Sequence, residues 1–140
     1  MNFKIFAIKT VSGILSCLKL NRISDKEVKN NLLTDYLALR KVIKSTEEDK
    51  REFVEKFQED WKDELLAVRK LRLEKQPVEG YDEYLKAEAE GNLILQKMDE
   101  TEVEVSINPV KIDKFVASVS EEEINFEQIA VLLDNGILEE

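Results

Sequence analysis

The sequence contains no histidine, one cysteine, two prolines and four glycines among its 140 residues. Without histidine it lacks the commonest acid–base group that titrates near neutral pH, the commonest zinc ligand and the usual base beside a serine or cysteine nucleophile. A single cysteine excludes a disulfide within the chain, and the apolar neighbours of Cys17 predict a small buried side chain. These absences argue against an enzyme.

Recognisable binding motifs are missing as well. The glycines are scattered and form no phosphate-binding loop, and the acidic run from Asp99 to Glu104 lacks the spacing of a calcium loop. Carboxylate pairs such as Glu48 and Glu52 recur at helical spacing, but neighbouring Lys and Arg residues offset them, which is typical of a solvated helix face. We therefore predict no catalytic residues, no metal ligands and no cofactor.

Basic residues are in deficit, with 21 Lys and Arg against 30 Asp and Glu, so the formal net charge is −9. This balance argues against nucleic acids and anionic membrane surfaces as partners, because both require a concentrated basic face. No apolar run approaches the ~18 residues of a membrane-spanning helix. The stretch from Lys9 to Cys17 faintly resembles a lipoprotein signal, but its apolar run is short and it fits an amphipathic helix, so we expect a protein that is not secreted.

Helix-forming sequence is abundant between Ser24 and Lys75, where there is neither glycine nor proline. A capping box at Ser24 and Glu27 predicts the start of a helix. An apolar stripe with spacings of three and four then keeps its phase across the polar stretch Lys44–Glu52; its members are Val28, Leu32, Tyr36, Leu39, Ile43, Phe53, Phe57, Trp61, Leu65, Val68 and Leu71.

The unbroken phase favours one continuous or gently kinked helix of about fifty residues. The alternative is two helices that meet at Ser45–Thr46. Each half begins acidic and ends basic, as the dipole of a separate helix favours. A break follows at Pro77–Gly80, and the next helix, Tyr81 to Met98, is predicted to return antiparallel along residues 58–75. Leu71 would then face Tyr84 and Leu85, and Trp61 would lie near Leu95. The positions that mark this helix are Tyr81, Leu85, Glu88 or Ala89, Asn92, Leu95 and Met98.

The remaining segments are short. Alternating apolar residues from Thr101 to Asn108 predict a strand whose partner is an N-terminal strand at Asn2–Ile8, and Val110–Ile112 extends or reverses the sheet. Three short helices are predicted, the first after a cap at Thr10, the second after a cap at Asp113, and the last from a cap at Asn125 to Asn135–Gly136.

These elements predict an α+β, mostly α fold in a single domain, residues 1–140. A long antiparallel helical hairpin, residues 46–100, projects from a small base, residues 1–45 and 101–140, that holds a two- or three-stranded sheet and the short terminal helices. A charged helix of low apolar density suits a projection that meets other subunits. The candidate interaction surface comprises Phe53, Phe57, Trp61, Glu48 and Glu52, although an aromatic stripe is more often core, and core is what we expect for Trp61.

The order of the elements resembles a group of small proteins encoded by tailed bacteriophages and prophages. The similarity covers most of the chain as pattern and rests on Asn2–Ile8, Ile23–Val28, the acidic strand Glu102–Val110 and the closing segment Glu121–Leu138. It implies a role in the virion or in its assembly, location in the virion or the host cytoplasm, and other protein subunits as partners in a homo- or hetero-oligomer. It offers no functional residues to carry over.

Two functions from different classes follow. The first, which we prefer, is a non-enzymatic structural or assembly protein, associated with a bacteriophage virion, that acts through protein–protein contacts and oligomerisation. The alternative is a small soluble adaptor or inhibitor that binds one host protein through its helical hairpin.

Overall fold

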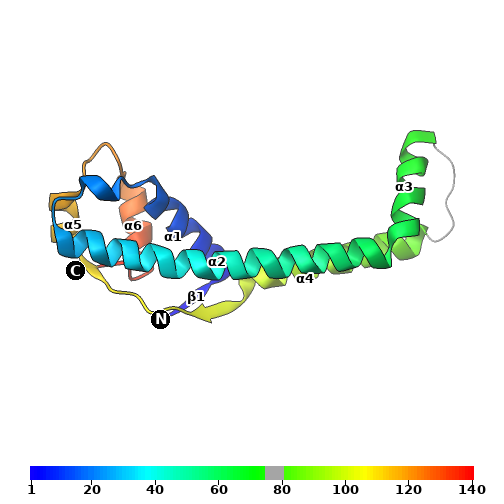
Figure 1. Cartoon of the computed structure of the whole chain (residues 1–140), viewed down its shortest axis with the longest axis horizontal. Helices are drawn as coiled ribbons and strands as arrows, with labels where there is room; N and C mark the ends of the chain where they lie inside the picture. The colour runs from blue at the N-terminus through cyan, green and yellow to red at the C-terminus, as the bar shows by residue number, and fades with distance from the viewer. Residues whose placement is uncertain (75–80) are drawn as a thin grey trace. The chain divides into compact units, whose positions relative to one another are not determined.

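The computed structural model describes residues 1–74 and 81–140, and the side chains of residues 1–69 and 81–140. Its elements in chain order are β1 (Asn2–Lys4), α1 (Ile5–Cys17), the short 3₁₀ helix η1 (Leu20–Arg22), α2 (Lys26–Asp60), α3 (Lys62–Glu74), α4 (Tyr81–Glu100), β2 (Glu102–Glu104), β3 (Val110–Lys111), α5 (Ile112–Ser118), α6 (Phe126–Asp134) and β4 (Leu138–Glu139). Helices dominate (Figure 1), so the predicted α+β, mostly α class is confirmed.

The chain divides into two compact units. One, here called the mixed unit, comprises Met1–Ser45 and Glu100–Glu140 and contains all four strands. The other, here called the helical unit, comprises Thr46–Asp99 and consists of the second part of α2, α3 and nearly all of α4. The predicted break at Pro77–Gly80 lies outside the described residues, as does the side chain of Leu71.

The mixed unit is built around a closed hydrophobic core. Helices α1, α2, α5 and α6 all contribute to it, and its most deeply buried side chains are Ile8, Val11, Leu15, Leu32, Leu39, Phe115, Leu132 and Ile137. Full burial of such a side chain stabilises a fold by about 1.5–3 kcal/mol, so this core accounts for much of the stability of the unit.

Two small sheets edge this core. Strand β1 pairs antiparallel with β2, with Phe3 opposite Val103, which confirms the predicted pairing although each strand has only three residues. Strand β3 pairs parallel with β4, with Val110 opposite Leu138. The segment at Val110 therefore neither extends nor reverses the first sheet, because it forms a second one with the C-terminal tail.

The predicted strand at Asn2–Ile8 is confirmed for Asn2–Lys4 alone, and the predicted cap at Thr10 is wrong. Helix α1 already begins at Ile5, and Thr10 lies inside it, where its hydroxyl donates to the carbonyl oxygen of Phe6. The buried residues of α1 are Ile5, Ile8, Val11, Ser12 and Leu15. Their helical spacing outweighs the β propensity of the segment. Cys17 is exposed, which corrects its predicted burial, because it lies off this face.

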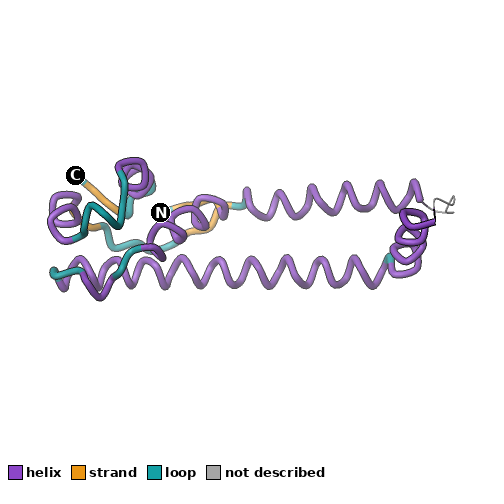
Figure 2. Tube along the Cα trace, turned by 90° about the horizontal axis from the view of Figure 1, so that it is seen from above, coloured by secondary structure: helices purple, strands orange, loops and turns teal. Residues whose placement is uncertain are grey.

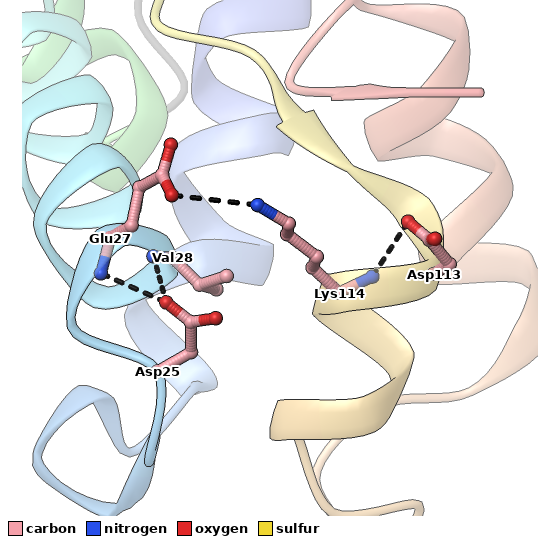
Figure 3. Close-up of polar contacts among 5 residues, drawn as sticks. All are labelled: Asp25, Glu27, Val28, Asp113 and Lys114. Carbon is pink, nitrogen blue, oxygen red and sulfur yellow. Dashed lines mark hydrogen bonds and ion pairs between the residues drawn. The ribbon is translucent and has the colours of Figure 1, made fainter.

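Polar contacts at the start of α2 differ from the predicted capping box (Figure 3). The carboxylate of Asp25, not the hydroxyl of Ser24, accepts from the backbone N–H groups of Glu27, at 2.9 Å, and Val28, at 3.2 Å. The side chain of Glu27 instead reaches Lys114 of α5, with 3.5 Å between Oε2 and Nζ. Aspartate ranks with serine as a helix cap, so the prediction was wrong by one residue.

The two later caps have opposite outcomes. The predicted cap at Asp113 is wrong, because α5 starts one residue earlier, without a side-chain cap, and Asp113 accepts only from the N–H of its neighbour Lys114 (Figure 3). The predicted cap at Asn125 is confirmed as a full capping box with Gln128. Gly136, with φ of 74°, ends α6 in the left-handed conformation, as predicted.

Helix α2 continues without a break through Lys44–Glu52, as predicted, and has no corner at Ser45–Thr46. The prediction of one helix as far as Lys75 is wrong, because α2 ends at Asp60 and α3 turns away from it after Trp61 (Figure 1). Helical hydrogen bonds continue across this bend, from Trp61 N–H to Phe57 O and from Leu65 N–H to Trp61 O. No glycine or proline marks it, so packing within the unit decides where the helix bends. Helix α4 returns antiparallel, as predicted, but it lies alongside residues 46–60 and not along 58–75 (Figure 2), and Trp61 meets Tyr84 instead of Leu95.

Candidate interaction surface

Three aromatic rings meet in the helical unit. The rings of Phe57 and Trp61 lie 6.3 Å apart between centroids, and Tyr84 of α4 lies 6.1 Å from Phe57 and 6.2 Å from Trp61. Aromatic pairs at such distances contribute about 0.5–1.5 kcal/mol beyond the area they bury. Tyr84 is buried, whereas Phe57 and Trp61 are half-buried, so the cluster is part core and part surface.

Helix α4 faces α2 at Gly91. A Cβ atom at this position would lie 3.7 Å from the nearest atom of the Phe53 ring and 3.8 Å from that of Phe57. The residues of α4 that are most covered are Tyr81, Tyr84, Ala87, Glu88, Gly91, Leu95, Met98 and Asp99. The predicted inner positions Leu85 and Asn92 are wrong, since both are exposed. Apolar residues occur on several sides of α4, and a contact through glycine leaves no apolar signal in the sequence.

A groove follows one flank of the helix pair. This hairpin groove has a volume of about 160 Å³ and is lined by Phe53, Val54, Phe57, Gln58, Leu65, Tyr84, Glu88, Gly91, Asn92 and Leu95. Val54 stands at its mouth with 37% of its surface exposed. The lining is mainly apolar and includes two of the three aromatic residues predicted as an interaction surface, Phe53 and Phe57.

The predicted glutamates do not belong to this surface. Glu48 and Glu52 are exposed and lie on the outward side of α2, where Arg51 is 3.7 Å from Glu48 and 3.9 Å from Glu55. Such exposed pairs contribute little to stability. A better-protected ion pair, with 2.7 Å between Lys50 Nζ and Asp99 Oδ1, joins α2 to α4 inside the unit. The structure therefore brings together the aromatic part of the predicted surface and leaves its acidic part elsewhere.

The apolar face of the helical unit is incompletely covered. Among its described residues, only Val68 and Tyr84 are buried hydrophobic side chains, whereas Val54, Leu66, Leu85, Leu93 and Ile94 are exposed. Sequence reasoning placed Tyr84 and Leu95 at the hairpin contact but missed Gly91 as a groove residue. The signal that could have found it is the spacing of Tyr84, Ala87, Gly91 and Leu95, which is three, four and four.

Asp35 of α2 is a second feature that sequence reasoning missed. It is fully buried in the mixed unit, and its Oδ1 accepts from the backbone N–H of Asn108 at 2.7 Å. Oδ2 meets no hydrogen-bond partner among the residues that the structure describes. Burial raises the pKa of Asp35 from its ordinary 3.8 to about 6, and the Asn108 N–H opposes that rise.

The position of Asp35 along α2 could have indicated its burial, because it continues the spacing of the buried residues Val28, Leu32 and Leu39. Its bond to the Asn108 N–H ties the segment between β2 and β3 to α2.

Residues 1–74 and 81–140 contain no cluster of three or more acidic or cysteine side chains suited to a metal ion. No helix in this described part of the chain is both long enough and apolar enough to span a membrane. Comparisons with protein-family models, with curated proteins and with solved structures returned no match to this chain.

Proposed function

We propose that this chain is a non-enzymatic structural or assembly protein that works through protein–protein contacts and oligomerises through its helical unit. The observation that carries the proposal is the open hairpin groove with Val54 exposed at its mouth. The resemblance to tailed-bacteriophage proteins extends the proposal to a virion-associated role, with the protein in the virion or the host cytoplasm. Other protein subunits, of its own kind or of the virion, are the proposed partners.

The physical argument concerns how many helices are needed to enclose an apolar face. An amphipathic helix presents a stripe at least about 100° wide, and two helices side by side cover only part of each other's stripe. Bundles close their cores with further helices. In this unit the rings of Phe53 and Phe57 remain half-buried beside the groove. A helix supplied by another subunit and laid in the groove would complete this core.

The proposal is tested by changing the mouth of the groove and measuring mass in solution. We expect the native chain to exceed its monomer mass of 16.2 kDa in light scattering coupled to gel filtration. Val54→Glu puts a charge where apolar surface would be buried. Because burial of an unpaired charge is strongly unfavourable, association should weaken by at least about tenfold.

Leu93→Glu is the matched control for this experiment. Leu93 is also exposed and on a helix of the same unit, but it lies about 200° around α4 from Gly91 and therefore on the opposite side from the hairpin contact. Circular dichroism should show unchanged helix content for both variants. Equal effects of the two substitutions would contradict a role for the groove. A native chain that stays monomeric at all concentrations would refute oligomerisation and favour the adaptor or inhibitor.

A further inference from the structure

The mixed unit carries a separate groove between α5 and α6, formed together with the loop that joins them (orange in Figure 1). This α5–α6 groove has a volume of about 500 Å³ and is lined by Phe115, Val116, Val119, Glu121, Glu122, Glu123, Ile124, Asn125, Phe126, Gln128 and Ile129. Its floor includes the buried side chains of Phe115, Val119 and Ile124. Val116 and Phe126 stand at the surface, 53% and 90% exposed.

The frame around Phe126 is fixed by hydrogen bonds. Phe126 is the first residue of α6 and directly follows the cap residue Asn125. In the capping box the Asn125 N–H donates to Gln128 Oε1 at 3.0 Å, and the Gln128 N–H donates to Asn125 Oδ1 at 2.9 Å. The loop before it is closed by a bond of 3.0 Å from Glu123 N–H to Ser120 O. An aromatic ring held in water by a rigid frame is the type of residue that anchors protein interfaces.

The rim of this groove is negative. Three consecutive glutamates, Glu121–Glu123, line it, and the lining contains no lysine or arginine. Lys19 and Arg22 border a neighbouring hollow together with Glu122 and Glu123, but no ion pair joins them within the described residues. The groove therefore suits a ligand that is apolar on one part and cationic on another.

A surface of that kind lies on α2 of the same unit. Leu33, Leu37, Arg40 and Lys44 are all exposed and follow one another at spacings of four, three and four, so they form one stripe along the helix. Leu33 and Leu37 are 39% and 52% exposed. No carboxylate interrupts the stripe, because the nearest one in sequence, Asp35, points into the core.

We propose that the α5–α6 groove of one copy of this chain binds the α2 stripe, defined by Leu33, Leu37, Arg40 and Lys44, of a second copy. Leu33 and Leu37 pack against Phe126 and Val116, and Arg40 and Lys44 lie beside the three glutamates. Helices bind grooves through anchors at this spacing. The contact goes beyond the proposed function, since it uses surfaces outside the helical unit. Because groove and stripe differ, the interface is heterologous and builds rings or chains of subunits.

Charge reversal tests this pairing in the full chain carrying Val54→Glu, where the hairpin groove no longer contributes. The groove variant carries Glu121→Lys, Glu122→Lys and Glu123→Lys, and the stripe variant carries Arg40→Glu and Lys44→Glu. We expect each variant alone to raise the dissociation constant for self-association at least about tenfold, by sedimentation velocity. A one-to-one mixture of the two should associate again, because each reversed surface then meets a complementary one.

The apolar part of the proposed contact is tested by Phe126→Ser, with Phe6→Ser as the control variant. Phe6 is also exposed, at 52%, but lies on α1 and does not line the groove. We expect Phe126→Ser to weaken association and Phe6→Ser to leave it unchanged. The melting temperatures of the two variants should agree. Raising the salt concentration from ~0.05 M to ~0.5 M should weaken the contact as well, since its charges are exposed.

The outcomes separate this proposal from the previous one. A strictly monomeric Val54→Glu protein overturns the groove–stripe contact, and so does a mixture of reversed variants that fails to associate. If Val54→Glu leaves the mass unchanged while the groove variant lowers it, the contact stands and oligomerisation through the helical unit fails. A native chain that is monomeric at every concentration overturns both.

Discussion

The mixed unit and the helical unit share one helix, α2, yet they use its apolar stripe differently. In the mixed unit the side chains of Val28, Leu32 and Leu39 are at most 1% exposed. In the helical unit Phe53 and Phe57, further along the same stripe, remain half-buried. Local sequence does not account for this contrast, because both parts of α2 are regular helix with apolar residues in phase.

The number of partners accounts for it. Around the first part of α2, three further helices and the strands approach from several directions and enclose eighteen buried hydrophobic residues. Around the second part, α4 covers one side, and only two hydrophobic side chains become buried in the described part of the helical unit. The helical unit therefore encloses much less of its apolar surface than the mixed unit does, and apolar surface that is left open is typical of interaction sites.

The contrast predicts different costs for the same deletion in the two units. Phe115→Ala, in the closed core, should lower the free energy of unfolding by about 3–5 kcal/mol, since the ring is fully buried. Phe57→Ala, beside the hairpin groove, should cost less than this in the monomer, because its ring is only partly buried. Urea unfolding at a protein concentration low enough for monomers measures both. Equal costs would show that the helical unit is as closed as the mixed one.

Asp35 is the polar exception inside the closed core, and it makes the stability of the chain depend on pH. Because its pKa is raised to about 6, the folded chain keeps the Asp35 proton between about pH 4 and pH 6, where an unfolded chain has lost it. This contribution therefore favours folding below about pH 4 and is lost as the pH rises to 6. The shift of roughly two pKa units corresponds to about 3 kcal/mol.

Asp35→Asn isolates this effect from the other carboxylates. Asparagine keeps an oxygen that accepts from the Asn108 N–H but does not titrate. The free energy of unfolding of the variant, relative to the native chain, should rise by about 3 kcal/mol between pH 4 and pH 7. A difference that stays constant with pH would show that Asp35 ionises as an exposed carboxyl group does.

The sequence was most informative where the signal was local and repeated. The capping box at Asn125, the left-handed glycine at Gly136 and the helix through Lys44–Glu52 follow from residue type and spacing, and the structure confirms them. The pairing of β1 with β2 was predicted from the alternation of apolar and polar residues in both segments, and the structure confirms it.

Errors occurred where tertiary contacts decide. The bend after Trp61 carries no local breaker, and the aromatic contact of Trp61 with Tyr84 depends on a helix that follows about twenty residues later. The groove residue Gly91 is invisible to a search for apolar stripes. Asp35 gives no apolar signal, although its spacing places it with Leu32 and Leu39 on the buried side of α2.

The two glycines with defined surroundings give the finest test of the contrast between the units. Gly91→Ala adds a methyl group at ordinary contact distance from Phe53 and Phe57 and removes the helix penalty of glycine, so it should stabilise the chain by about 0.5–1 kcal/mol. Gly136→Ala should instead destabilise it by about 1–2 kcal/mol, because φ is 74° and the new methyl group would collide with Met1. Thermal unfolding of both variants measures whether each substitution stabilises or destabilises the chain. Should Gly91→Ala destabilise the chain, α4 would lie closer to Phe53 than an open groove allows, and the helical unit would have to be regarded as fully packed.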